Sequence, residues 1–232
     1  MSAIKLYHGS ERVVSRPSLA LARPHNDYGR GFYTTRMCDL AGEWACQRGN
    51  DGFINSYTLW TEGLAVLDLL DGTHATLEWV ALLLKNRHFD LRLPTAALAR
   101  EELVERFCPD LSDVDVVLGY RADDSYFSYV RSFVENALPL SSLEEALVLG
   151  DLGEQTVLVS GNAFSQLTFE GYEPVSAERF YPRFVNRDKE ARTGFHDLLG
   201  RQRPSLSDLF ILDILREEMT SDDPRLQGHV SR

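Results

Sequence analysis

The sequence predicts one strand-rich α+β domain followed by a C-terminal helical extension. A chain of 232 residues can bury a full hydrophobic core as a single domain. Short segments that alternate apolar and polar residues, typical of strands, are interspersed with segments that have the 3.6-residue period of helices. No apolar run approaches the roughly 20 residues that span a bilayer, and the N-terminus lacks an apolar signal core. We therefore expect a soluble, cytoplasmic protein without a membrane partner.

The first 60 residues are expected to form two strands and a helix. Alternating apolar and polar residues predict strands at 4–7 and 53–60. Between them, a proline-containing loop leads to a helix that Thr34 or Thr35 can cap. The apolar residues of this helix recur at three- and four-residue spacing, which places Trp44 on its buried face.

The middle of the chain is expected to add two more strands and two helices. Residues 64–69 are expected to form a strand that pairs with the preceding one. Thr73 or Thr76 can open an apolar helix, and Thr95 can open the next. Residues 114–119 then form a run typical of a buried strand.

The remaining elements are less regular in their pattern. We expect a helix capped at Asp123 or Asp124, and then a helix opened by a capping box of Ser141 and Glu144. A last clear strand follows at 155–160, and an apolar helix at about 205–219. Residues 171–205 mix aromatic residues with arginines and predict no clear element. We therefore expect a domain over residues 1–170 and an extension over 171–232 that packs on it.

Charge and composition limit the chemistry. The formal net charge is −11, yet residues 1–50 carry seven Lys or Arg against four Asp or Glu. A locally basic segment suits an anionic pyrophosphate, while the overall acidity works against non-specific binding to nucleic acid. The three cysteines have no Cys-x-x-Cys spacing and the six histidines no His-x-x-x-His spacing, so neither a disulfide framework nor a metal site is expected.

Two motifs near the N-terminus predict a nucleotide chemistry. The first is Leu-Tyr-His-Gly-Ser at residues 6–10, and the second is Asp-Tyr-Gly-Arg-Gly-Phe-Tyr-Thr-Thr at residues 27–35. In order and separation they resemble the first two motifs of the His-Tyr-Glu class of ADP-ribosyltransferases, which includes diphtheria-toxin-like and poly-ADP-ribose-polymerase-like enzymes. The resemblance extends over about residues 4–169, to a bacterial domain-of-unknown-function family of that superfamily. It implies a split, mainly antiparallel β-core flanked by helices, with NAD as co-substrate.

The resemblance implies roles for residues of the two motifs. His8 would hydrogen-bond a ribose hydroxyl, Gly9 would hold the nicotinamide carboxamide through its backbone, and Tyr33 would stack on the nicotinamide ring. Trp44, eleven residues after Tyr33, would be a second stacking aromatic, or simply one more apolar residue on a buried helix face. The implied NAD-binding set is completed by Ser10, Arg30 and Gly31.

The third motif of the class is less clear. The class has a glutamate at the start of a late strand, where its carboxylate binds the ribose 2′-hydroxyl and stabilises the developing oxocarbenium ion. Here Glu154 and Gln155 both stand at that point, and strand alternation lets only one of them face the pocket. By resemblance Gln155 takes the position, with Glu154 as the second candidate. Asp123 and Asp124 would either position the acceptor or cap a helix.

The function implied is mono-ADP-ribosylation. NAD would be cleaved at the nicotinamide–ribose bond, and ADP-ribose would pass to a macromolecular acceptor, a protein or a nucleic acid. The resemblance suggests a bacterial toxin or defence effector, with a neutralising antitoxin as a conceivable partner. Two alternatives stay open: an NAD glycohydrolase with water as acceptor, and a catalytically silent interaction module whose partner-binding element is the apolar helix at 209–219.

Overall fold

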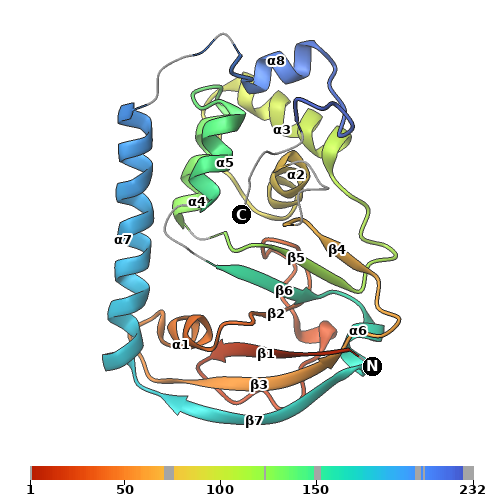
Figure 1. Ribbon diagram of the computed structural model, residues 1–232, viewed down its shortest axis with the longest axis vertical. Helices are drawn as coiled ribbons and strands as arrows, with labels where there is room; N and C mark the ends of the chain where they lie inside the picture. Colours follow the sequence, from red (N-terminus) through yellow and green to blue (C-terminus); the bar gives the residue numbers. More distant parts are fainter. Residues whose placement is uncertain are drawn as a thin grey trace.

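The computed structural model describes residues 2–70, 76–122, 124–148, 153–201, 205 and 207–226. It confirms the α+β class (Figure 1). The strands are β1 (Ala3–Ser10), β2 (Phe32–Thr34), β3 (Gly52–Trp60), β4 (Val66–Asp68), β5 (Val116–Tyr120), β6 (Glu154–Leu158) and β7 (Leu167–Val175). The helices are a 3₁₀ turn (Leu19–Leu21), α1 (Cys38–Cys46), α2 (Thr76–Asn86), α3 (Pro94–Phe107), α4 (Asp124–Val134), α5 (Leu140–Val148), α6 (Gly161–Ser165), α7 (Ala177–Arg201) and α8 (Ile211–Arg216).

The strands form two sheets. A three-stranded sheet has the order β1-β3-β7, and a four-stranded sheet has the order β2-β6-β5-β4. All pairs are antiparallel except β4 and β5, which run parallel. The expected pairing of residues 64–69 with the strand at 53–60 is therefore wrong. Both edges of β3 are taken, by β1 and β7, so β4 pairs with β5 in the other sheet.

The two sheets face each other over a small apolar core and are joined along β1 and β2. Leu6 and Tyr57 from the three-stranded sheet pack with Phe32 and Leu158 from the four-stranded sheet. Burial of these side chains stabilises the pair of sheets because apolar surface is removed from water. The other face of the four-stranded sheet carries Val157 and packs against the helical half of the molecule, α2 to α5 and α8 (Figure 1).

The C-terminal part of the chain is more regular than expected. β7 runs from residue 167 to 175 and pairs with β3 along its length. α7 is a 25-residue helix that contacts α1, α4 and α5 (Figure 1). Pro182, which lies inside the helix, and the alternation of aromatic and arginine residues hide its period in the sequence. The helix expected at about 205–219 is shorter, since α8 spans only Ile211–Arg216.

Several helix starts differ from those expected. Met37 is the N-cap of α1, and Thr35 instead accepts a hydrogen bond from the Met37 amide at 3.2 Å. α5 begins at Leu140, so Ser141 lies inside the helix and not at its cap. Glu144, the other member of the expected capping box, accepts from the Thr76 hydroxyl at 2.9 Å. Of the helices in the described ranges, none has both the length and the apolar character needed to cross a bilayer.

Candidate functional site

The site lies where β1 and β2 separate. The backbone amides and carbonyls of Tyr7 and Thr35 bond reciprocally, at 2.8 and 2.9 Å, and form an antiparallel bridge between the two sheets. Continuing that register would place Gly9 opposite Tyr33. Instead, the His8 imidazole donates a hydrogen bond from Nδ1 to the Tyr33 carbonyl oxygen at 2.8 Å. The backbone pairing between the sheets therefore stops at Tyr7, and β1 and β2 are unpaired beyond it; we call this unpaired interval the gap.

Gly9 presents its backbone to this gap. In an antiparallel pair, successive residues direct their N–H and C=O groups to alternate sides. Tyr7 directs its groups away from β3 and toward Thr35, so Gly9, two residues on, does the same. None of the hydrogen bonds of the described chain outside the regular strands involves the Gly9 backbone. An amide donor and a carbonyl acceptor side by side match a carboxamide.

Gly9 also allows α1 to approach β1. A Cβ at this position would lie 1.8 Å from the Ala41 carbonyl oxygen and 2.7 Å from the Ala45 nitrogen. Only a glycine permits this contact between strand and helix backbone. The contact brings α1, and with it Trp44, to the edge of the gap.

The protonation state of His8 follows from its contacts. The ring is partly buried, and burial lowers the pKa of the imidazole from 6.5, although the bond to the Tyr33 carbonyl opposes this shift. A carbonyl only accepts, so Nδ1 must carry the proton in the neutral ring. Nε2 is then a hydrogen-bond acceptor. His8 contacts Phe32 on the other sheet, with ring centroids 4.7 Å apart.

Tyr33 is held by the glycine-rich loop that precedes it. Its hydroxyl donates to the Gly29 carbonyl at 2.8 Å and accepts from the Tyr28 amide at 3.0 Å. Burial, and next the charge of Asp27, raise the pKa of this hydroxyl far above its usual value. Gly29 adopts a φ of 76°, which a side chain would strain. The hydroxyl therefore closes the loop and leaves the ring at a fixed position.

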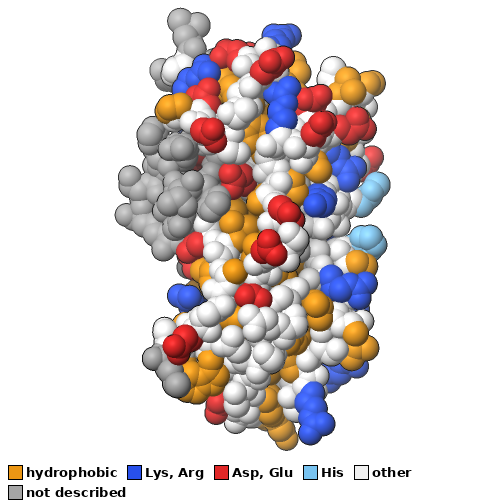
Figure 2. All heavy atoms as spheres, turned by 90° about the vertical axis from the view of Figure 1, so that its right-hand side faces the viewer, with side chains coloured by type: hydrophobic (Ala, Val, Ile, Leu, Met, Phe, Trp, Pro, Cys, Tyr) orange, Lys and Arg blue, Asp and Glu red, His pale blue; other side chains and the backbone are white. Residues whose placement is uncertain are grey.

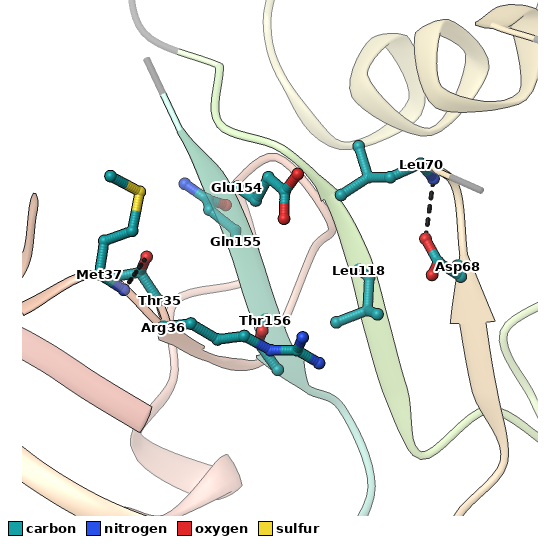
Figure 3. Close-up of a pocket in the computed structure, with 9 residues that line it drawn as sticks. All are labelled: Thr35, Arg36, Met37, Asp68, Leu70, Leu118, Glu154, Gln155 and Thr156. Atoms are coloured by element: carbon teal, nitrogen blue, oxygen red, sulfur yellow. Dashed lines mark hydrogen bonds between the residues drawn. The ribbon is translucent and has the colours of Figure 1, made fainter. Parts of the chain in front are cut away.

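Gln155 and Glu154 lie on opposite faces of β6. Tyr33 pairs with Val157, so Gln155, two residues away, shares the face of Tyr33 at a diagonal distance of about 7–8 Å. Gln155 is 6% exposed, and its Oε1 has no hydrogen-bond partner among the described residues. Glu154 is exposed on the other face, and the two side chains point apart in Figure 3. The four-stranded sheet therefore presents an amide beside Tyr33.

Glu154 lines a pocket of about 130 Å³, and Gln155 is also among its lining residues. Figure 3 shows it over β6, β5 and the end of β4, with Arg36 reaching beneath from the β2–α1 connection. Its remaining lining residues are Thr35, Met37, Asp68, Leu70, Leu118 and Thr156. The pocket mixes one cation with two carboxylates. The pocket is therefore lined by the four-stranded sheet and the connection from β2 to α1.

Trp44 is 9% exposed and stands beside Arg121. The Arg121 guanidinium carbon lies 5.2 Å from the centre of the Trp44 ring and 5.8 Å from the ring of Phe184, on α7. The Trp44 Nε1 atom is buried and has no hydrogen-bond partner within the described part of the chain. Arg121 and Phe184 did not stand out in the sequence. The signal for Arg121 was its place two residues after the buried strand expected at 114–119.

Three residues of the implied NAD-binding set make contacts within the protein. The Ser10 hydroxyl donates to the Arg12 carbonyl at 2.6 Å and accepts from Asn55. Arg30 is exposed and reaches the Ala20 carbonyl at 3.4 Å. Gly31 packs against β6, where a Cβ would lie 2.7 Å from Val157. The implied roles of these three residues in NAD binding stay predictions.

Asn55, in the middle of β3, fixes the end of the first motif. It is fully buried, donates from Nδ2 to the His8 carbonyl at 3.2 Å, and accepts at Oδ1 from the Val14 amide at 2.8 Å. A polar residue within an aromatic strand was the signal that could have identified it. Asp123 lies outside the described residues, and α4 begins at Asp124, whose side chain is also outside them. Among the described residues, no three His, Cys, Asp or Glu side chains gather as a metal site requires.

Comparison with known proteins gives one match. A family model described as "Protein of unknown function (DUF3990)" matches residues 4–169. No curated protein and no solved structure matches the chain. The matched segment begins in β1 and ends in β7, and it includes His8, Tyr33, Trp44 and Gln155. The relation to ADP-ribosyltransferases stays a prediction. Since the match covers more than half of the 232 residues, the chain belongs to the DUF3990 family of proteins of unknown function.

Proposed function

We propose that this protein is a mono-ADP-ribosyltransferase that cleaves NAD at the nicotinamide–ribose bond and transfers ADP-ribose to a macromolecular acceptor. The observation that carries the proposal is the opening between β1 and β2. There the His8 imidazole donates a hydrogen bond to the Tyr33 carbonyl, and the Gly9 backbone groups are directed into the gap. This arrangement unites three groups that the reaction needs: a carboxamide clamp, an aromatic ring and a hydroxyl acceptor.

Each group has a defined task in the proposed reaction. The Gly9 amide and carbonyl bind the carboxamide and orient the nicotinamide. The Tyr33 ring contacts the pyridinium face, because aromatic faces attract a cationic ring. The Nε2 atom of neutral His8 accepts a hydrogen bond from a ribose hydroxyl, since its Nδ1 proton is engaged by Tyr33. Holding the substrate in this way lowers the barrier by orientation.

Gln155 is the group on which turnover depends. Its amide oxygen can accept from the ribose 2′-hydroxyl, yet it brings no charge to the oxocarbenium ion that forms as the bond breaks. Glu154 is the nearest carboxylate in sequence, but it lies on the other face of β6. This observation favours, as second candidate, a catalytically silent module that retains NAD binding.

The acceptor is more consistent with a protein than with a nucleic acid. Figure 2 shows acidic and basic side chains interspersed among apolar ones on the face that carries β4. Nucleic acid binding favours an extended basic surface, and the net charge of −11 opposes it.

The test is incubation of the purified protein with adenine-labelled NAD and a cell lysate, with His8→Ala and Gln155→Ala variants in parallel. Transfer of label to protein, together with nicotinamide release, supports the transferase. Nicotinamide release without transfer assigns the glycohydrolase reaction. Binding of NAD without release assigns the silent module, and absence of NAD binding contradicts the proposal as a whole.

A further inference from the structure

Two buried polar atoms beside the gap have no protein partner among the described residues: Trp44 Nε1, a donor, and Gln155 Oε1, an acceptor. Their side chains are 9% and 6% exposed. A buried polar group without a hydrogen bond is costly, and such groups in native proteins generally have a reason. A ligand group that satisfies both atoms would bind favourably.

Both atoms belong to elements that meet at the start of β6. Leu40, on α1, packs against Gly153, where a Cβ would lie 2.4 Å from its Cδ2 atom. Trp44 follows Leu40 by one helical turn and therefore lies on the same side of α1. Gly153 is two residues before Gln155. Ala41 and Ala45, which contact Gly9, lie about 100° around the helix from Leu40 and Trp44. Trp44 is therefore next to the Gly9 contact, on the side of α1 that Leu40 directs toward Gly153.

One face of the Trp44 indole contacts the Arg121 guanidinium. Arg121 lies over the indole at 5.2 Å from its centre, and its backbone N–H bonds the Gly153 carbonyl at 3.2 Å. Phe184 of α7 contacts the same guanidinium at 5.8 Å. A positively charged nicotinamide ring would compete with Arg121 for this face. The N–H at the edge of the Trp44 ring is independent of that contact.

We propose that the Trp44 indole N–H and the Gln155 amide oxygen bind one hydroxyl of the nicotinamide ribose. The hydroxyl accepts from Trp44 and donates to Gln155. This inference rests on the proposed function and departs from a stacking role for Trp44. The ligand group must accept a hydrogen bond from Trp44 and donate one to Gln155. The nicotinamide carboxamide can also do both, but in the proposed function it binds the Gly9 backbone. Trp44 is thus a ribose-binding residue, and α7 positions it through Phe184 and Arg121.

The test follows the indole N–H resonances of ¹⁵N-labelled protein during titration with NAD, ADP-ribose and nicotinamide. The Trp44 resonance is identified by its loss in Trp44→Phe, which keeps an aromatic ring and removes the donor. Trp60→Phe is the matched control, because Trp60 is 43% exposed at the end of β3. We expect NAD and ADP-ribose, which carry the hydroxyl, to shift the Trp44 resonance, and nicotinamide alone to leave it in place.

Affinity provides the second measurement. Trp44→Phe should weaken binding of NAD and ADP-ribose roughly tenfold, the loss expected for one buried hydrogen bond, whereas Trp60→Phe should bind as the wild type does. An unmoved Trp44 resonance in a protein that binds NAD overturns this inference alone, as does an equal shift with nicotinamide. If the wild type binds neither NAD nor ADP-ribose, the proposed function fails, and the inference fails with it.

Discussion

His8 couples the site to pH. Burial lowers its pKa below the value of 6.5 that it has in the unfolded chain, so between these two values the unfolded state binds more protons. Stability contributed by neutral His8 is therefore fully present above about pH 6.5 and is lost as the pH falls through this window. We expect the melting temperature of the wild type to fall more steeply from about pH 7 to about pH 5 than that of His8→Asn, which cannot titrate but can still donate to Tyr33. Equal slopes in the two proteins would contradict this assignment.

Tyr33 separates a structural role from a ligand-binding role. Its hydroxyl bonds Gly29 and Tyr28, while its ring is the part proposed to contact nicotinamide. Tyr33→Phe should lower the free energy of unfolding by about 1–2 kcal/mol and retain NAD consumption. Tyr33→Ala should abolish consumption, as should His8→Ala. Near-normal nicotinamide release by either alanine variant, with native circular dichroism, would remove that residue from the mechanism.

Gly9 is the residue most sensitive to a small substitution. An alanine Cβ would overlap the Ala41 carbonyl of α1, and because that atom is backbone the helix must move. We expect Gly9→Ala to destabilise the protein by about 3 kcal/mol, measured by urea unfolding. Gly161→Ala is the control, since nothing lies within 4 Å of a Cβ there. A similar small effect of both substitutions would show that α1 does not rest on Gly9.

At the scale of elements, α7 is held to α1 by an ion pair between a buried carboxylate and a partly buried guanidinium. Arg187 donates from Nε and Nη2 to both carboxylate oxygens of Glu43, at 2.9 and 3.0 Å, and Glu43 is 1% exposed. Arg187→Met would leave this carboxylate buried without its guanidinium partner, and removal of one member of a buried pair costs about 3–5 kcal/mol. Arg192→Met should change the unfolding free energy by less than about 1 kcal/mol, because its pair with Asp188 is exposed.

A double variant tests the cause of that loss. Glu43→Leu combined with Arg187→Met removes both charges, so we expect it to recover most of the stability that Arg187→Met loses. If the double variant is as unstable as the single one, packing of the arginine stem and not the unpaired carboxylate is responsible.

The elements also show what a sequence can reveal. The strands at 4–7, 53–60 and 114–119 were predictable because each alternates or concentrates apolar residues in a short run. α7 was not, because Phe180, Phe184 and Phe195 contact different partners along a helix in which ten charged residues are interspersed. The pairing of β4 depends on which strands have a free edge in the folded protein. A local sequence pattern does not contain this information.

The candidate site was predictable only in part. His8, Gly9 and Tyr33 belong to contiguous motifs, and the structure places them together. Strand alternation requires that only one of Glu154 and Gln155 shares a face with Tyr33. The register of β6 with β2 decides that it is Gln155. Arg121 reaches Trp44 from 77 residues away in sequence. Contacts of this kind arise from tertiary packing, so they have no local signal.

For the whole molecule, α7 links the sheets to the helical half. Phe180 fills the space that a side chain at Gly42 would take, and the Tyr129 hydroxyl on α4 donates to the Ala191 carbonyl at 2.8 Å. A chain that ends at Ser176 keeps the segment matched by the family but loses these contacts. We expect its thermal unfolding to be less cooperative and its midpoint lower, as followed by calorimetry. An unchanged transition would show that the matched segment is stable without α7.

The bridge between Tyr7 and Thr35 gives the molecule a natural gate. Two backbone hydrogen bonds, each worth about 1 kcal/mol in net terms, hold β1 against β2 at the point where the sheets begin to part. Breaking them is a far smaller event than unfolding either sheet, so the aperture can widen while the apolar core around Leu6 and Phe32 stays closed. For the proposed NAD site, we expect ligand entry and exit to depend on the opening of these two hydrogen bonds. Exchange of the two amides with deuterium would time that opening directly.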